Sequence, residues 1–152
     1  MKINEVILYL ESLAHPSLQE HYDNAGLITG HAGWECSGII CSLDATEEVV
    51  NEAVEKKCNL IVAHHPIIFG GLKRLNGNNY IERTVIKAIQ NNIAIYALHT
   101  NLDNVLDGVN AKIAETILKS FKNYPQEKIQ KVITCIQQCS FSKSPSTNPL
   151  TL

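Results

Sequence analysis

The stretch Leu60-Ile61-Val62-Ala63-His64-His65-Pro66 is an unbroken apolar run that stops at two histidines. Residues 93–98 form a second apolar run, and His99 follows it directly. A third run, residues 38–43, comes before both of them. Short apolar runs without polar alternation are typical of strands that are buried on both faces of a parallel sheet.

Helical patterns separate these runs. Residues 44–57 begin with capping side chains and acids, continue with apolar residues at helical spacing and end in two lysines. Residues 80–90 show the same apolar spacing, as do residues 3–13 and 108–121. Strand, helix, strand, helix, strand predicts an α/β fold with a mainly parallel sheet, and right-handed crossovers place the three strands side by side. Residues 27–29 could form a further short strand.

Composition narrows the class of protein. The chain has 152 residues, 45% of them hydrophobic and 18% charged, with a net charge of −2, which suits one folded domain. Basic residues are scattered, so we expect no nucleic-acid partner. No run approaches the roughly 20 apolar residues of a membrane helix, and no signal peptide is visible, so we expect a cytoplasmic protein without a membrane partner. Five cysteines without a C-x-x-C pair argue against a disulfide framework.

The expected domain covers residues 1–121. Beyond it the apolar periodicity fades, and residues 140–152 are rich in Ser, Thr, Lys, Asn and Pro. We therefore predict that residues 122–152 form a disordered tail.

Candidate chemistry lies where the strands end. Open parallel sheets bind ligands beyond the carboxyl ends of their strands, and His64, His65 and His99 all stand at such ends. Asp103 follows four residues after His99. Imidazole and carboxylate together suit zinc, iron, manganese or nickel. Because neighbouring side chains on an extended backbone point in opposite directions, we expect His64 and His65 to hold different ions or to straddle a site.

A simpler interpretation stands beside each candidate. A single histidine at a strand end is usually a surface residue, and we prefer that interpretation for His15, His21 and His31, which lie in turns. Asp44 could reach the same edge of the sheet, but we favour a role as a helix cap.

Four segments, in order, resemble the Nif-three-like family, whose members are also labelled GTP cyclohydrolase I type II homologues. They are Tyr22-Asp23-Asn24-Ala25-Gly26-Leu27, Ser42-Leu43-Asp44-Ala45-Thr46, Leu60 to Phe69 with its HHP motif, and Tyr96 to Asp103 with its HTNLD motif. The resemblance covers roughly residues 1 to 118.

This resemblance implies a layered α/β fold and a centre of two divalent metal ions in a ring-shaped hexamer. It makes His64, His65 and Asp103 metal ligands and places His99 beside the metals as a proton carrier. The family takes a further His and Glu from a C-terminal segment, whereas this sequence has no histidine after His99. We therefore expect the N-terminal portion of the family core, in a C-terminally truncated form.

Two classes of function fit these expectations. The first is a metal-dependent hydrolase acting on a small molecule that the sequence does not identify, because two ions can activate water and polarise a phosphoryl or carbonyl oxygen. The alternative is a metal-binding scaffold or regulatory protein without enzymatic activity, or an inactive fragment. No nucleotide-binding motif such as G-x-G-x-x-G is present to favour a nucleotide substrate.

Overall fold

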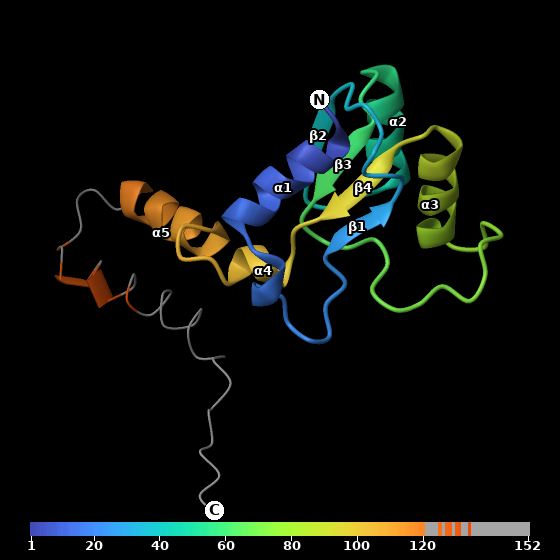
Figure 1. Ribbon diagram of the computed structural model, residues 1–152. Helices are drawn as coiled ribbons and strands as arrows, with labels where there is room; N and C mark the ends of the chain where they lie inside the picture. The colour runs from blue at the N-terminus through green and yellow to red at the C-terminus, as the bar shows by residue number, and fades with distance from the viewer. Residues whose placement is uncertain (121–124, 126, 129, 132–133, 135–152) are drawn as a thin grey trace, which may run out of the picture. The chain divides into compact units, whose positions relative to one another are not determined.

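The computed structural model describes residues 1–120, 125, 127–128, 130–131 and 134 (Figure 1). They divide between two units, one that ends at Leu102 and one that begins at Asp103. The first unit carries the sheet, and its packing explains the position of the site.

Four short strands form one sheet in the order β1-β4-β3-β2. Their bounds are β1 Gly26–Thr29, β2 Ile39–Ser42, β3 Leu60–Ala63 and β4 Ala94–Ala97. β2, β3 and β4 are parallel neighbours, as the apolar runs and the crossover rule predict. β1 pairs antiparallel with β4, so the sheet is mixed but mainly parallel.

Helices cover both faces of this sheet. α2 (Glu47–Glu55) and α3 (Tyr80–Gln90) pack together against one face, over a core that includes Ile61 and Ile95. Tyr96 points to the opposite face, because side chains alternate along a strand. Its hydroxyl donates to Glu11 of α1 (Ile3–Leu13), so α1 covers that second face (Figure 1).

Local sequence explains where the two crossover helices begin. The Thr46 hydroxyl accepts a hydrogen bond from the backbone N–H of Val49 and caps α2. The Asn79 side chain does the same for Glu82 and caps α3 at 2.9 Å. Both helices begin within a few residues of the positions that the apolar spacing predicts, and α3 has the predicted bounds.

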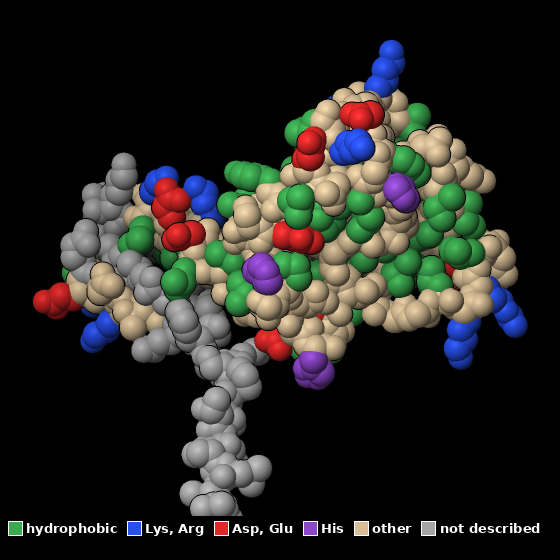
Figure 2. Space-filling view, in the orientation of Figure 1, with side chains coloured by type: hydrophobic (Ala, Val, Ile, Leu, Met, Phe, Trp, Pro, Cys, Tyr) green, Lys and Arg blue, Asp and Glu red, His purple; other side chains and the backbone are tan. Residues whose placement is uncertain are grey.

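Two helices follow β4 within residues 98–120. α4 (Thr100–Asp103) is a single short turn that the sequence does not predict, and α5 (Val109–Ser120) matches the predicted helix at 108–121. Most of the predicted tail, residues 122–152, lies outside the described residues. None of the described helices is long and apolar enough to span a membrane. On the face shown in Figure 2, acidic and basic side chains are interspersed, without a broad patch of one sign.

Candidate metal centre

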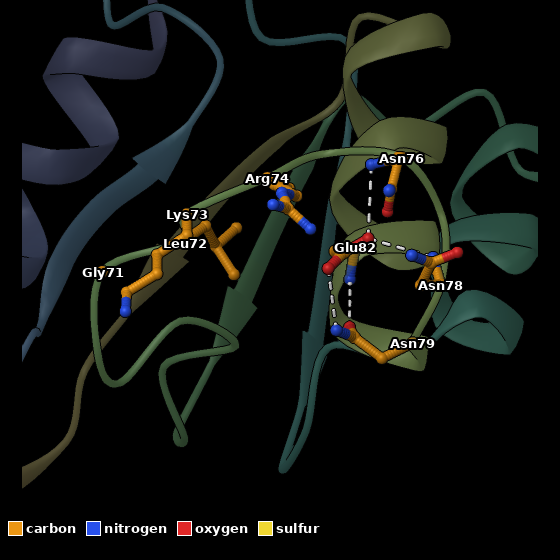
Figure 3. A pocket seen from close by; sticks show the side chains of 8 residues that line it. All are labelled: Gly71, Leu72, Lys73, Arg74, Asn76, Asn78, Asn79 and Glu82. Carbon is orange, nitrogen blue, oxygen red and sulfur yellow. Dashed lines mark hydrogen bonds between the residues drawn. The ribbon is translucent and has the colours of Figure 1, made fainter.

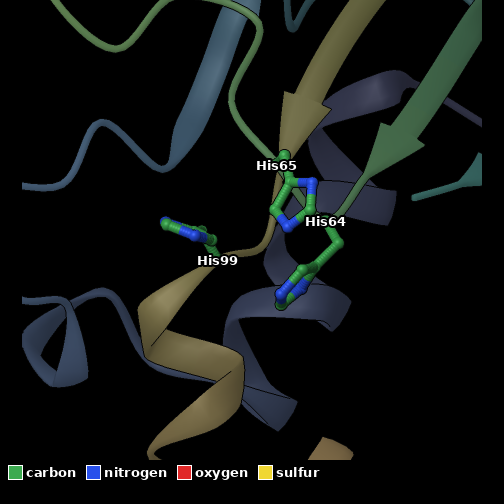
Figure 4. A group of neighbouring side chains, drawn as sticks. All are labelled: His64, His65 and His99. Carbon is green, nitrogen blue, oxygen red and sulfur yellow. The ribbon is translucent and has the colours of Figure 1, made fainter. Parts of the chain in front are cut away.

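Three histidines from two strands meet at one edge of the sheet (Figure 4). Ala63 and Ala97 are paired in the register of β3 and β4, so the two strands end level with each other. His64 and His65 follow the first strand and His99 follows the second. The parallel ladder continues past the strand ends, because the backbone N–H of His64 donates to Ser42 O at 3.1 Å. The backbone of His64 is therefore held in place by the sheet.

The three imidazoles are close enough to share an ion. One ring nitrogen from each of His64, His65 and His99 lies within 4.8 Å of the others, so the group could hold a metal ion. The ring centroids are 4.9 to 5.7 Å apart. Around a tetrahedral zinc ion with Zn–N bonds of about 2.0–2.1 Å, ligand nitrogens lie roughly 3.4 Å apart. To share one zinc ion, the nitrogens would therefore have to approach one another by at most about 1.4 Å.

The expectation that His64 and His65 point in opposite directions is wrong. β3 ends at Ala63, and the backbone bends at both histidines. Side-chain alternation holds only for extended backbone, so it no longer applies there. The bend turns both rings toward the same space as His99 (Figure 4).

A buried carboxylate supports His99. The Asp23 side chain is fully buried, and its Oδ1 lies 2.8 Å from Nδ1 of His99. Burial alone raises the pKa of Asp23, but hydrogen bonds from the Thr100 hydroxyl, from His99 and from the backbone of Thr100 and Asn24 outweigh it, and the pKa lies below its ordinary value. A carboxylate on one ring nitrogen of a histidine is the usual arrangement behind metal-ligating histidines.

His65 has a carboxylate partner as well. Its Nδ1 lies 2.7 Å from Oδ1 of Asp44. The preferred interpretation of Asp44 as a helix cap is therefore wrong, since Thr46 caps α2. Unlike the Asp23 pair, this pair is exposed: the side chain of His65 is 44% accessible and that of Asp44 is 56% accessible.

An aromatic side chain borders the cluster. The ring of Phe69 meets His99 edge to face, with centroids 5.4 Å apart, and remains 53% exposed. The preceding residue is held by the side chain of Asn24, whose amide donates to Ile68 O at 2.7 Å. An apolar surface is thus fixed beside the imidazoles, where it can contact a bound molecule.

The other predicted ligand, Asp103, is the first residue of the second unit. Its role in metal binding therefore stays a prediction. The structure gives His99 the same access to a shared ion as His64 and His65, so His99 is a candidate ligand as well as a candidate proton carrier.

The remaining candidates show no comparable arrangement. His15, His21 and His31 are exposed, as the sequence predicts. Among the described residues, no other group of histidine, cysteine and acidic side chains is close enough to hold an ion. Cys36, Cys41 and Cys58 are free thiols.

A hollow away from the histidines lies beside the start of α3 (Figure 3). It has a volume of about 610 Å³ and is lined by loop residues 71–74, three asparagines and Glu82. The Glu82 carboxylate accepts backbone N–H groups of Asn76 and Asn78 and the side-chain amide of Asn79. Since this carboxylate already holds the loop together, the hollow is a poor candidate for a cation site.

Asp23 is the main residue of the site that the residue pattern missed. It lies 76 residues before His99, in a turn-rich segment without periodicity. The family resemblance could have indicated Asp23, because the segment Tyr22 to Leu27 carries part of that resemblance.

The chain is similar to a known protein family and to curated proteins. A family model described as Duf34/NIF3 (NGG1p interacting factor 3) matches residues 1–144. A "GTP cyclohydrolase 1 type 2 homolog" of Clostridium acetobutylicum is 38% identical over 117 residues, which are 77% of this chain and 44% of the relative. The chain thus spans less than half the length of this curated relative.

Two solved structures are also similar to the chain. Protein SA1388 of Staphylococcus aureus superposes with a TM-score of 0.73 and 43% identity, over 76% of this chain and 33% of that one. A Bacillus cereus protein related to NIF3 superposes with a TM-score of 0.73 and 39% identity, over 76% of this chain and 32% of that one.

Proposed function

The chain belongs to the Duf34/NIF3 family, and we propose that it binds one divalent transition-metal ion through His64, His65 and His99 in support of a hydrolytic reaction. The observation that carries the proposal is the convergence of three imidazoles from two strands within 4.8 Å. Three histidines with a fourth position open to water form a common ligand set of catalytic zinc sites.

The donor set fits such an ion. Neutral imidazole binds zinc, iron and nickel well. Two of the three rings also have a carboxylate on Nδ1, at 2.8 Å for His99 and 2.7 Å for His65. These carboxylates orient the rings and raise the basicity of the nitrogens that remain.

The number of ions follows from the number of ligands. Three imidazoles serve one ion, and a pair of ions would need further protein ligands, because catalytic sites use about three per ion. Asp103 is the predicted further ligand. We therefore expect one ion per chain. Assembly of six copies into a ring belongs to the same proposal and rests on the resemblance alone.

The proposed reaction is hydrolysis. A bound ion supplies Lewis acidity and lowers the pKa of a water in its open position. The chain's own residues orient that chemistry: Asp23 and Asp44 hold two of the rings, and the exposed face of Phe69 can contact an apolar or planar part of a substrate. The name of the Clostridium acetobutylicum relative makes a nucleotide ring the first substrate class to test.

The test is turnover of nucleotides and phosphoesters by the full chain, with added zinc, iron or manganese and after chelation. Metal-dependent turnover that His64→Ala abolishes supports a hydrolase. A metal-loaded chain without turnover on any of these compounds favours a non-enzymatic metal-binding protein. Failure to retain any of the metals contradicts the proposal as a whole.

A further inference from the structure

The two oxygens of the Asp23 carboxylate have four hydrogen-bonding partners. Its Oδ2 accepts the backbone N–H of Thr100 at 3.0 Å and also the Thr100 hydroxyl. Its Oδ1 accepts the backbone N–H of Asn24 at 2.6 Å and lies 2.8 Å from Nδ1 of His99. An ionised carboxylate has about four lone-pair sites, so each oxygen has its full complement of two partners.

The direction of each hydrogen bond is fixed by its neighbours. The backbone N–H groups of Thr100 and Asn24 can only donate. The Thr100 hydroxyl accepts the backbone N–H of Glu20 at 3.0 Å, so its own proton is directed to Asp23. With three donors already on this carboxylate, the remaining contact is satisfied when His99 donates from Nδ1.

We propose that Asp23 is a positioning residue that holds His99 as the Nδ1–H tautomer and so leaves its Nε2 lone pair available to the histidine cluster. In a neutral imidazole one nitrogen carries the proton and the other accepts, so fixing the proton on Nδ1 fixes the acceptor at Nε2. The tautomer is a property of the metal-free chain. Its consequence for metal affinity rests on the proposed function.

The exposed pair at the same site provides an internal comparison. Asp44 contacts His65 with the same geometry, at 2.7 Å, but both side chains are largely open to water. Asp23 is fully buried, and His99 is only 15% accessible. Water can compete with Asp44 for the exposed ring of His65, whereas the buried carboxylate of Asp23 is shielded from such competition. The control of tautomer is therefore assigned to Asp23 rather than to both carboxylates.

Long-range ¹H–¹⁵N NMR on the metal-free, full-length chain tests this at about pH 8, where ordinary imidazole is neutral. We expect His99 to be the Nδ1–H tautomer in the wild type. Asp23→Asn should add the Nε2–H form, because the amide can donate to Nδ1 where the carboxylate could only accept. Thr100→Val removes a hydrogen bond from the same network but keeps the carboxylate, so it should leave the tautomer unchanged.

Zinc titration of the same variants gives a second readout. Asp23→Asn should weaken zinc binding by about 10–100-fold, the usual effect of losing such a partner, and Asp44→Asn should weaken it less. A wild-type His99 in the Nε2–H form overturns the inference even where Asp23→Asn does not fold. An unchanged tautomer in folded Asp23→Asn also overturns it. If the wild type binds no zinc, the proposed function fails while the NMR result still decides the role of Asp23.

Discussion

Replacing Asn101 by alanine should cost about 3 kcal/mol of stability and loosen the backbone at His99. Asn101 is 2% exposed, and its side chain makes two hydrogen bonds at 2.9 Å. The amide donates to Ala14 O at the end of α1, and the carbonyl accepts the backbone N–H of His99. The side chain thus connects α1 to the segment that carries the site.

The magnitude follows from the two groups that lose a partner. A backbone group left unsatisfied costs about 1–3 kcal/mol, so we assign about 2 to the buried Ala14 carbonyl and about 1 to the partly buried His99 N–H. For a chain of this length, 3 kcal/mol corresponds to a fall in Tm of about 6–12 °C.

Thermal and urea unfolding followed by circular dichroism would measure both quantities. Asn91→Ala is the matched control, because the side chain of Asn91 makes one exposed hydrogen bond, to Lys87 O at 2.8 Å. It should change stability by no more than about 0.5 kcal/mol. If Asn101→Ala were no more destabilising than Asn91→Ala, the connection between α1 and His99 would be refuted.

Two further predictions concern titratable side chains. Backbone N–H donors, first that of Asn78, hold the pKa of Glu82 below its ordinary value, so its ionised form stabilises the fold at neutral pH and this stabilisation is lost as the pH falls through the folded-state pKa. Glu82→Gln should therefore lower Tm at about pH 7, and its difference from wild type should shrink toward about pH 3; a constant difference would contradict the role of the charge. Burial, with the nearby Glu11, raises the pKa of Tyr96 to about 12. Tyr96→Phe should remove a phenol that ionises at about pH 12 from an ultraviolet titration. It should also cost about 1 kcal/mol for the lost hydrogen bond to Glu11, and a titration curve identical to wild type would contradict this.

Much of the fold could be predicted because its signals are local. The apolar runs that became β3 and β4 are unbroken, and the helical spacing of residues 80–90 matches the bounds of α3. Parallel neighbours with short crossovers then follow from general rules of connection. The short turn α4 was missed because four residues give too little periodicity to recognise.

Only part of the candidate metal site could be predicted from the sequence. Histidines at the ends of two adjacent parallel strands must lie at one edge, so their convergence could be predicted. The bend at His64 and His65 could not, since it arises where the strand ends and alternation no longer holds. The roles of Asp23 and Asp44 depend on contacts across 76 and 21 residues of sequence, which no local pattern encodes.

Zinc titration by calorimetry tests the three-histidine site most directly. The wild-type chain should bind one ion per chain, and His64→Ala, His65→Ala and His99→Ala should each weaken binding. His15→Ala is the control, since His15 is exposed and bonded only locally to Ser17, and it should leave binding unchanged. Two tight sites per chain, or wild-type affinity in His99→Ala, would contradict a single ion shared by the three imidazoles.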